Sequence, residues 1–163
     1  MGTGSGMSEN EWVVRASAAD VFAVLGDGWS YAGWVVGAAR VRSVDDGFPA
    51  AGTSLHHSVG VWPFLVDDVT TVEEFEPDQR LVIKVRAWPA GAGRVEFVTT
   101  AHPDGCLLVM REEAIEGPAN LLPTAAVDSV LHWRNTETLR RLAFLAESRA
   151  GLHRSQPAAG RVS

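Results

Sequence analysis

Residues 124–148 read TAAVDSVLHWRNTETLRRLAFLAES and contain neither glycine nor proline. Apolar side chains recur in this stretch at the three- and four-residue spacing that places them on one face of an α-helix. The residues on this face are Leu131, Leu139, Leu142 and Ala146, and Asn135 falls among them. The stretch therefore predicts one long helix, whose apolar face must be buried against another layer of the chain.

The sequence before this helix changes to a period of two, which is typical of β-strands. Six such stretches, separated by short turns rich in glycine, proline and aspartate, cover residues 37–44, 53–61, 65–75, 80–88, 94–102 and 106–117. Because short connections cannot form parallel crossovers, these strands are predicted to form an antiparallel meander.

The N-terminal part supplies a further strand and two short helices. Residues 10–16 are predicted as a strand, and Ser17 followed by Asp20 is close to a capping box that begins a helix ending at Gly26 or Gly28. A second short helix or turn is predicted directly after it. The predicted fold is α+β, with a seven-stranded antiparallel sheet wrapped around the long C-terminal helix and two short helices after the first strand.

Three stretches carry a resemblance to a known family: SAADVFAVLGDGWSYAGWVVGA (17–38), SLHHSVGVWP (54–63) and RNTETLRRLAFLAE (134–147). In this order they resemble the polyketide cyclase/dehydrase-type group of small bacterial SRPBCC proteins, within the START and birch-pollen-allergen superfamily. The resemblance implies a helix-grip fold that binds lipids, sterols or polyketides between helix and sheet. We accordingly expect a flexible leader (1–8), a single SRPBCC domain (9–148) and a flexible tail (149–163).

Composition and charge argue against several function classes. A net charge of −6 leaves no basic stripe for nucleic acid, and no apolar run approaches the roughly 18–20 residues needed to cross a bilayer. Cys106 is the single cysteine, which excludes an internal disulfide and a thiolate zinc site. His56 and His57 are adjacent on a strand and point to opposite faces, so they make a poor metal site. We expect a cytoplasmic protein without metal, cofactor or integral membrane association, as a monomer or weak homodimer.

Tryptophan is unusually frequent, with six tryptophans against one tyrosine. Walls that line ligands use tryptophan more freely than packed cores do. The turns of a meander fall alternately at the two ends of the sheet, and this count places Trp34, Trp62 and Trp88 at the same end. Residues 27–34 (DGWSYAGW) are then predicted to line the mouth of an apolar cavity. The alternative is that these aromatic side chains plug the open end of a filled interior.

Strand alternation selects two ionisable side chains that face the interior. His57 shares the phase of the apolar residues of its strand, and Glu112 shares that of Met110. A buried carboxylate and a neighbouring imidazole can exchange protons, so His57 and Glu112 are the candidate catalytic residues. One alternative is that His57, Glu112 or Asn135 orients a ligand without catalysis. The structural alternative is a satisfied core histidine and a Glu112 that pairs with Arg134 or Lys84.

The interior polar set includes one further carboxylate, because either Asp67 or Asp68 must face inward; the pattern of their strand leaves the choice open. The candidate ligand-binding residues are mostly apolar or aromatic. They are Trp29, Tyr31, Trp34, Val59, Trp62, Trp88, Phe97, Met110, Leu131 and Asn135. The sequence favours a carrier or sensor that binds an apolar small molecule between sheet and helix. The alternatives are a polyketide cyclase or dehydratase that uses proton transfer in the same cavity, and a protein-interaction role such as a toxin–antitoxin component.

Overall fold

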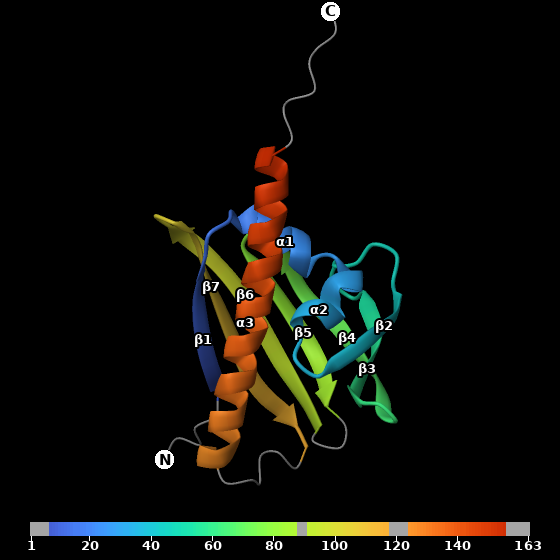
Figure 1. The fold of residues 1–163 in the computed structure, drawn as a ribbon. Coiled ribbons are helices and arrows are strands. Elements are labelled where there is room, and N and C mark those ends of the chain that lie inside the picture. The colour runs from blue at the N-terminus through green and yellow to red at the C-terminus, as the bar shows by residue number, and fades with distance from the viewer. Residues whose placement is uncertain (1–6, 88–90, 118–123, 156–163) are drawn as a thin grey trace, which may run out of the picture.

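The computed structural model describes residues 7–87, 91–117 and 124–155, with side chains described over 7–86, 91–117 and 129–151. The elements follow in the order β1 (Met7–Val14), α1 (Ala18–Leu25), the 3-10 helix η1 (Gly28–Ser30), α2 (Tyr31–Trp34), β2 (Ala38–Val44), β3 (Ser54–Val61), β4 (Phe64–Glu76), β5 (Arg80–Ala87), β6 (Gly91–His102), β7 (Gly105–Glu116) and α3 (Thr124–Ser155). The strands form one seven-stranded antiparallel sheet in the order β1-β7-β6-β5-β4-β3-β2, which curves around α3 (Figure 1). The predicted helix-grip fold is confirmed.

Two element boundaries differ from the expected ones. β1 begins at Met7, inside the expected leader, because its ladder with β7 already starts at the pair Met7↔Glu113. α3 continues to Ser155, beyond the expected boundary at residue 148, and Ala150 is still buried at 8% exposure. The buried stripe of α3 thus runs on into the segment whose small and polar residues suggested a flexible tail.

The segment between β1 and β2 places α2 against the sheet. Ser17 and Asp20 form the predicted capping box of α1, in which each side chain accepts a hydrogen bond from the backbone N–H of the other residue. α1 ends at Leu25 with Gly26 as its C-cap, and the Asp27 carboxylate accepts a hydrogen bond from the backbone of Trp29 to begin η1. α2 follows at once and lies between α3 and β2 (Figure 1).

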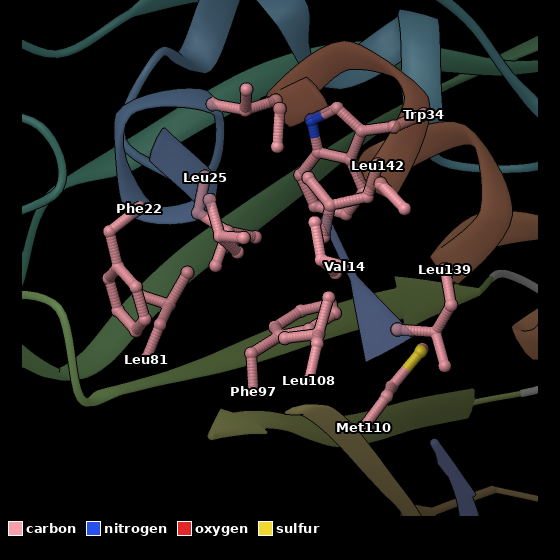
Figure 2. Close-up of a cluster of buried hydrophobic side chains, with 14 of the residues drawn as sticks. Val14, Phe22, Leu25, Trp34, Leu81, Phe97, Leu108, Met110, Leu139 and Leu142 are labelled. Atoms are coloured by element: carbon pink, nitrogen blue, oxygen red, sulfur yellow. The ribbon is translucent and has the colours of Figure 1, made fainter. Parts of the chain in front are cut away.

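The hydrophobic core fills the space between the concave face of the sheet and the helices. Figure 2 shows Leu139 and Leu142 of α3 with Phe97 of β6 and Met110 of β7, and all four are at most 4% exposed. α3 packs along β1 and against α1 and α2. Among the helices of the described ranges, none combines the length and the apolar character needed to cross a membrane.

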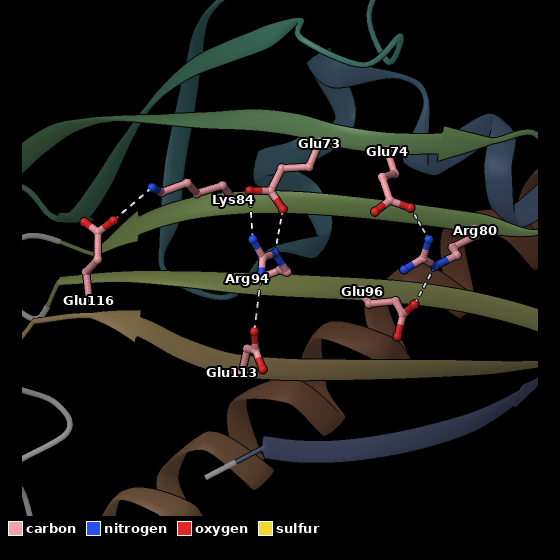
Figure 3. A network of polar contacts seen from close by, with 8 residues as sticks. All are labelled: Glu73, Glu74, Arg80, Lys84, Arg94, Glu96, Glu113 and Glu116. Carbon is pink, nitrogen blue, oxygen red and sulfur yellow. Dashed lines mark hydrogen bonds and ion pairs between the residues drawn. The ribbon is translucent and has the colours of Figure 1, made fainter. Parts of the chain in front are cut away.

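The opposite, convex face of the sheet carries a ladder of ion pairs (Figure 3). Arg94 of β6 bonds Glu73 of β4 at 2.6 Å and Glu113 of β7 at 3.2 Å. Glu96 of β6 accepts from Arg80 of β5 at 2.6 Å and from Arg111 of β7 at 3.1 Å. Similar pairs join Arg80 to Glu74, Lys84 to Glu116 and Arg111 to Glu9. The convex face is therefore polar and faces solvent. The apolar face of the sheet is the one that α3 covers.

Candidate functional site

Tyr31, the first residue of α2, is the centre of a polar group inside the apolar core. Its ring stacks on His57 of β3, with ring centroids 4.9 Å apart and an interplanar angle of 16°. Oγ1 of Thr70 on β4 lies 3.0 Å from the Tyr31 hydroxyl and 3.0 Å from Nε2 of His57. All three residues are at most 4% exposed. A short helix and the two strands of one hairpin thus build one hydrogen-bonded set away from water.

The donors of this set can be assigned by giving each hydroxyl proton an acceptor. Thr70 is the only hydrogen-bond partner that the described residues offer to the Tyr31 hydroxyl, so the Tyr31 proton is satisfied when it is donated to Oγ1 of Thr70. Thr70 then donates its own proton to Nε2 of His57. The proton of the neutral imidazole is left on Nδ1. In this assignment the chain of hydrogen bonds ends in an N–H donor at Nδ1 of His57 that has no acceptor among the described residues.

Three buried polar atoms have no hydrogen-bond partner in the described part of the chain: Nε1 of Trp34, Nδ1 of His57 and Oδ2 of Asp68. They share one neighbourhood, because Trp34 packs edge-on against Tyr31 at 5.2 Å and Asp68 is the cross-strand partner of His57. Each of the three residues is at most 6% exposed. Buried polar atoms are normally paired, so these three atoms are the candidate polar contacts of a binding site.

Burial keeps the tyrosine and the histidine of this set uncharged at neutral pH. It raises the pKa of the Tyr31 phenol to about 12. Burial also lowers the pKa of His57 to about 4, with a smaller contribution from the positive charge of Arg42. The pKa of Asp68 is raised, again mainly by burial, although the backbone N–H of Val69 stabilises its carboxylate. The site therefore offers neutral N–H donors beside a carboxyl group that is more basic than usual.

Glu112 of β7 belongs to a second polar group, on the other side of the core. Nη2 of Arg134 donates to Oε1 of Glu112 at 2.6 Å and to Oε2 at 2.5 Å, and Nδ2 of Asn135 donates to Oε2 at 2.9 Å. The Glu112 side chain is 11% exposed and Asn135 is fully buried. Both carboxylate oxygens of Glu112 therefore have partners on α3. Of the two partners considered for Glu112, the structure selects Arg134, and Lys84 pairs with Glu116 instead.

The predicted proton-exchanging pair of His57 and Glu112 is not formed. Both side chains lie on the helix side of the sheet, as their strand phase predicts, but β4, β5 and β6 separate their strands and no hydrogen bond joins them. The carboxyl group opposite His57 is that of Asp68. Asp67 points to the other face, where it accepts a hydrogen bond from Ser58 at 2.8 Å.

The sequence profile of the family described as "Polyketide cyclase / dehydrase and lipid transport" matches residues 8–147. The chain belongs to this family. Within the described residues, no group of three or more His, Cys, Asp or Glu side chains could hold a metal ion. A search of curated protein sequences finds no match to this family member.

Solved structures share the fold of this polyketide cyclase/dehydrase-type protein at low sequence identity. The di-domain ARO/CYC StfQ from the steffimycin biosynthetic pathway is 16% identical with a TM-score of 0.71, over 89% of this chain and 51% of that chain. A protein of unknown function from Staphylococcus aureus is 8% identical with a TM-score of 0.71, over 89% of this chain and 95% of that one. Ara h 8.0201 is 12% identical with a TM-score of 0.66, over 87% and 97%. The chain thus spans about half of the length of the di-domain structure.

The candidate ligand-binding residues of this family member separate into three groups. Tyr31, Trp34, Phe97, Met110 and Asn135 are buried between the sheet and the helices, whereas Val59 and Leu131 are half-buried. Trp29 and Trp62 are 63% and 82% exposed, and Trp88 lies outside the described residues. Within the first group, Tyr31 and Phe97 contact Trp34, and Asn135 donates to Glu112.

The expected ring of tryptophans at one mouth does not hold for Trp34 and Trp62. Trp34 ends α2, whose other side faces α3, so its indole is pressed into the core against Phe97 at a centroid distance of 5.7 Å. Trp62 lies in the turn between β3 and β4 and points into solvent. The two rings are not in contact, because Trp34 is buried in the core while no layer of the described chain covers the tip of the β3–β4 hairpin that carries Trp62.

Sequence reasoning left Asp68 as one of two alternatives and missed Thr70. Their strand has no clear apolar phase, but its partner strand does. The turn between β3 and β4 contains only two residues, Trp62 and Pro63, and this length sets the register that places Asp68 opposite His57. The phase of His57 and the length of that turn were the signals that could have identified Asp68 as the inward carboxylate.

Proposed function

We propose that this protein binds an apolar, polyketide- or lipid-like small molecule between the sheet and α3, as a carrier or sensor, and holds a neutral oxygen atom of that ligand. The observation that carries the proposal is the set of three unpaired, buried polar atoms on Trp34, His57 and Asp68. Trp34 Nε1 is a neutral N–H donor, and so is His57 Nδ1 in the tautomer assigned above, so the two suit a carbonyl or phenol oxygen within an apolar molecule. An anionic ligand group would lack a charged partner at these donors.

The family supports the ligand class. Its description joins polyketide cyclases and dehydrases with lipid transport, and these ligands combine a large apolar surface with a few oxygen atoms. StfQ, which shares the fold, is an ARO/CYC of the steffimycin biosynthetic pathway. Because that protein is only 16% identical and only 51% of its chain is covered, its likeness supports the fold and leaves the ligand a proposal.

A matched pair of small ligands tests the proposal. Fluorenone and fluorene share a planar apolar skeleton, and only the ketone can accept a hydrogen bond. We expect the wild-type protein to bind fluorenone about 10-fold more tightly, because one or two net hydrogen bonds of about 1 kcal/mol each separate the two ligands. Trp34→Phe removes the indole donor and keeps an aromatic ring, so it should reduce the preference without weakening fluorene binding. Equal affinities in the wild-type protein would reject the polar anchor, and no binding of either ligand would count against an apolar site.

A cyclase or dehydratase is the second candidate function, and the unpaired Oδ2 of Asp68 favours it. The Asp68 carboxylate, made more basic by burial, can accept a proton from the carbon beside a ligand ketone while His57 Nδ1–H stabilises the resulting enolate oxygen. Mass spectrometry of bound 1-indanone in D₂O would detect this proton exchange at the carbon. Asp68→Asn keeps the shape of the side chain and removes the base. If the protein is an enzyme, this variant abolishes exchange and retains binding. No exchange in the wild-type protein leaves the carrier role.

A further inference from the structure

The outward face of α3 carries large apolar side chains that the fold does not cover. Trp133 and Phe144 are each 65% exposed. Each lies two residues from a buried residue, Asn135 or Leu142, which places it about 200° around the helix from the core. Figure 1 shows this face of α3 on the outside of the molecule, with no other element in front of it. The face opposite the core is thus apolar at two points and open to a partner.

Charged side chains lie between these two aromatic residues. The Glu137 carboxylate accepts hydrogen bonds from Arg140 at 2.7 and 2.8 Å and from Arg141 at 2.8 Å. Trp133, Glu137, Arg140 and Phe144 follow one another at intervals of four, three and four residues. This is the heptad spacing that keeps a straight seam between two helices packed at about +20°.

The seam is self-complementary when it is read in the reverse direction. It contains an aromatic residue, an acid, a base and an aromatic residue in this order. About a two-fold axis level with the midpoint between Thr138 and Leu139, Trp133 of one copy faces Phe144 of the other, and Glu137 faces Arg140. We propose that α3 pairs antiparallel with α3 of a second copy of this chain through this seam, which we call the α3 seam (Trp133, Glu137, Arg140 and Phe144).

The charges favour this arrangement over a parallel one. A parallel pair places Glu137 against Glu137 and Arg140 against Arg140, which repel, whereas the antiparallel pair places opposite charges together twice. An isologous contact of this kind closes on itself and gives a dimer rather than a filament. The occupant is a second copy because the seam complements its own reverse order. The ligand-binding interior lies on the other side of α3, so the proposal does not depend on the proposed function.

Sedimentation across micromolar to submillimolar concentrations tests the contact. The wild-type chain is expected to show a monomer–dimer equilibrium. Trp133→Glu or Phe144→Glu should raise the dimer dissociation constant by at least about 10-fold, since buried aromatic residues dominate such interfaces. Trp62→Glu is the matched control, because Trp62 is 82% exposed on the β3–β4 turn and should leave the dimer unchanged. A wild-type chain that stays monomeric, or a Trp62→Glu variant that dissociates while the α3 variants do not, overturns the proposal.

Charge exchange tests which residues face each other. Glu137→Arg places two arginines together and should weaken the dimer, whereas the double variant Glu137→Arg/Arg140→Glu restores opposite charges in the antiparallel seam and should recover it. Helical circular dichroism of the monomers shows that both variants fold. Failure of the double variant to recover the dimer, with the monomer folded, contradicts the proposed register.

Cysteine cross-linking tests the direction of the two helices. Trp133→Cys chains and Phe144→Cys chains are oxidised separately and as a mixture. In the antiparallel seam only the mixture forms a covalent dimer, and one aromatic pair stays intact in it. Cys106 is 2% exposed and does not compete. Cross-linking of either variant alone indicates a parallel contact, and no cross-link in the mixture indicates another surface; each result overturns the proposal.

Discussion

His57 should make the stability of the protein depend on pH in a predictable direction. Burial lowers its pKa from 6.5 to about 4 in the folded state, whereas the unfolded chain keeps the ordinary value. Between pH 6.5 and 4 the unfolded state therefore binds more protons than the folded state, so the free energy of unfolding falls as the pH falls through this window. Above pH 7 the imidazole is neutral in both states and the penalty is absent.

The size of the effect follows from the shift. One pKa unit corresponds to about 1.4 kcal/mol, so the full penalty below pH 4 is about 3 kcal/mol and most of it is present at pH 4.5. The comparison is between wild type and His57→Gln, which keeps a hydrogen-bonding group near Thr70 and does not titrate. Urea denaturation followed by circular dichroism at pH 7 and pH 4.5 gives the free energy of unfolding of both chains.

The difference between the two chains isolates the histidine. The raised pKa of Asp68 acts in the opposite direction, because the folded state disfavours its ionised form and stability is lost as the pH rises through its titration, but Asp68 is present in both chains. The wild-type chain should lose about 2 to 3 kcal/mol more than His57→Gln between pH 7 and 4.5. Equal losses would show that His57 takes up its proton in the folded protein as readily as in the unfolded chain, and would refute the lowered pKa.

Urea denaturation also tests three predictions about how α3 packs against the rest of the fold. Arg134→Met leaves the Glu112 carboxylate, 11% exposed, with only Asn135 as partner, and should lower the free energy of unfolding by about 3–5 kcal/mol. The control Lys84→Met breaks an exposed ion pair and should lower it by less than about 1 kcal/mol. Similar losses in the two variants would contradict the burial of Glu112. Asn10→Ala removes three hydrogen bonds of the Asn10 amide nitrogen: to Nδ1 of His132 (2.9 Å), to the carbonyl of His132 (3.3 Å) and to Thr136 (3.0 Å). The free energy of unfolding should fall by about 1–3 kcal/mol. No loss would mean that apolar contacts alone hold β1 against α3. Leu142 is fully buried, so Leu142→Ala should lower the free energy of unfolding by about 2–5 kcal/mol. Leu145 is half-buried, so Leu145→Ala should lower it by less. The reverse order would mean that the other face of α3 packs in the core.

The fold could be predicted because each of its elements has a local signal. The long apolar stripe of α3 has the helical period, the strands have a period of two with short turns, and Ser17 with Asp20 marks the start of α1. Local signals fail where neighbouring segments decide the outcome. Residues near 149 look like a tail, yet Ala150 is buried because the core stripe of α3 continues.

The candidate site could be predicted only in part, because strand phase gives the face of a residue and not its neighbours. The phase correctly placed His57 inside. It could not show that Glu112 is held by Arg134 of α3, since this choice depends on how the helix lies over the sheet. For the same reason Trp34 and Trp62, which were both expected at the mouth of the cavity, differ in burial. Trp34 is covered by α3, and Trp62 has nothing above it.

The pairing of β1 with β7 sets an order of events during synthesis. β1 leaves the ribosome first, but its neighbour in the sheet is the last strand, and about 90 residues separate Val14 from Gly105. At roughly 5–20 residues per second, the N-terminal strand waits on the order of 5 to 20 seconds for its partner. The hairpins from β2 to β6 pair with neighbours in sequence and can form during this time, whereas β1 and α3 close the molecule together at the end. A nascent chain that stops before β7 therefore leaves Trp12 and Val14 of β1 without the strand and the helix that bury them.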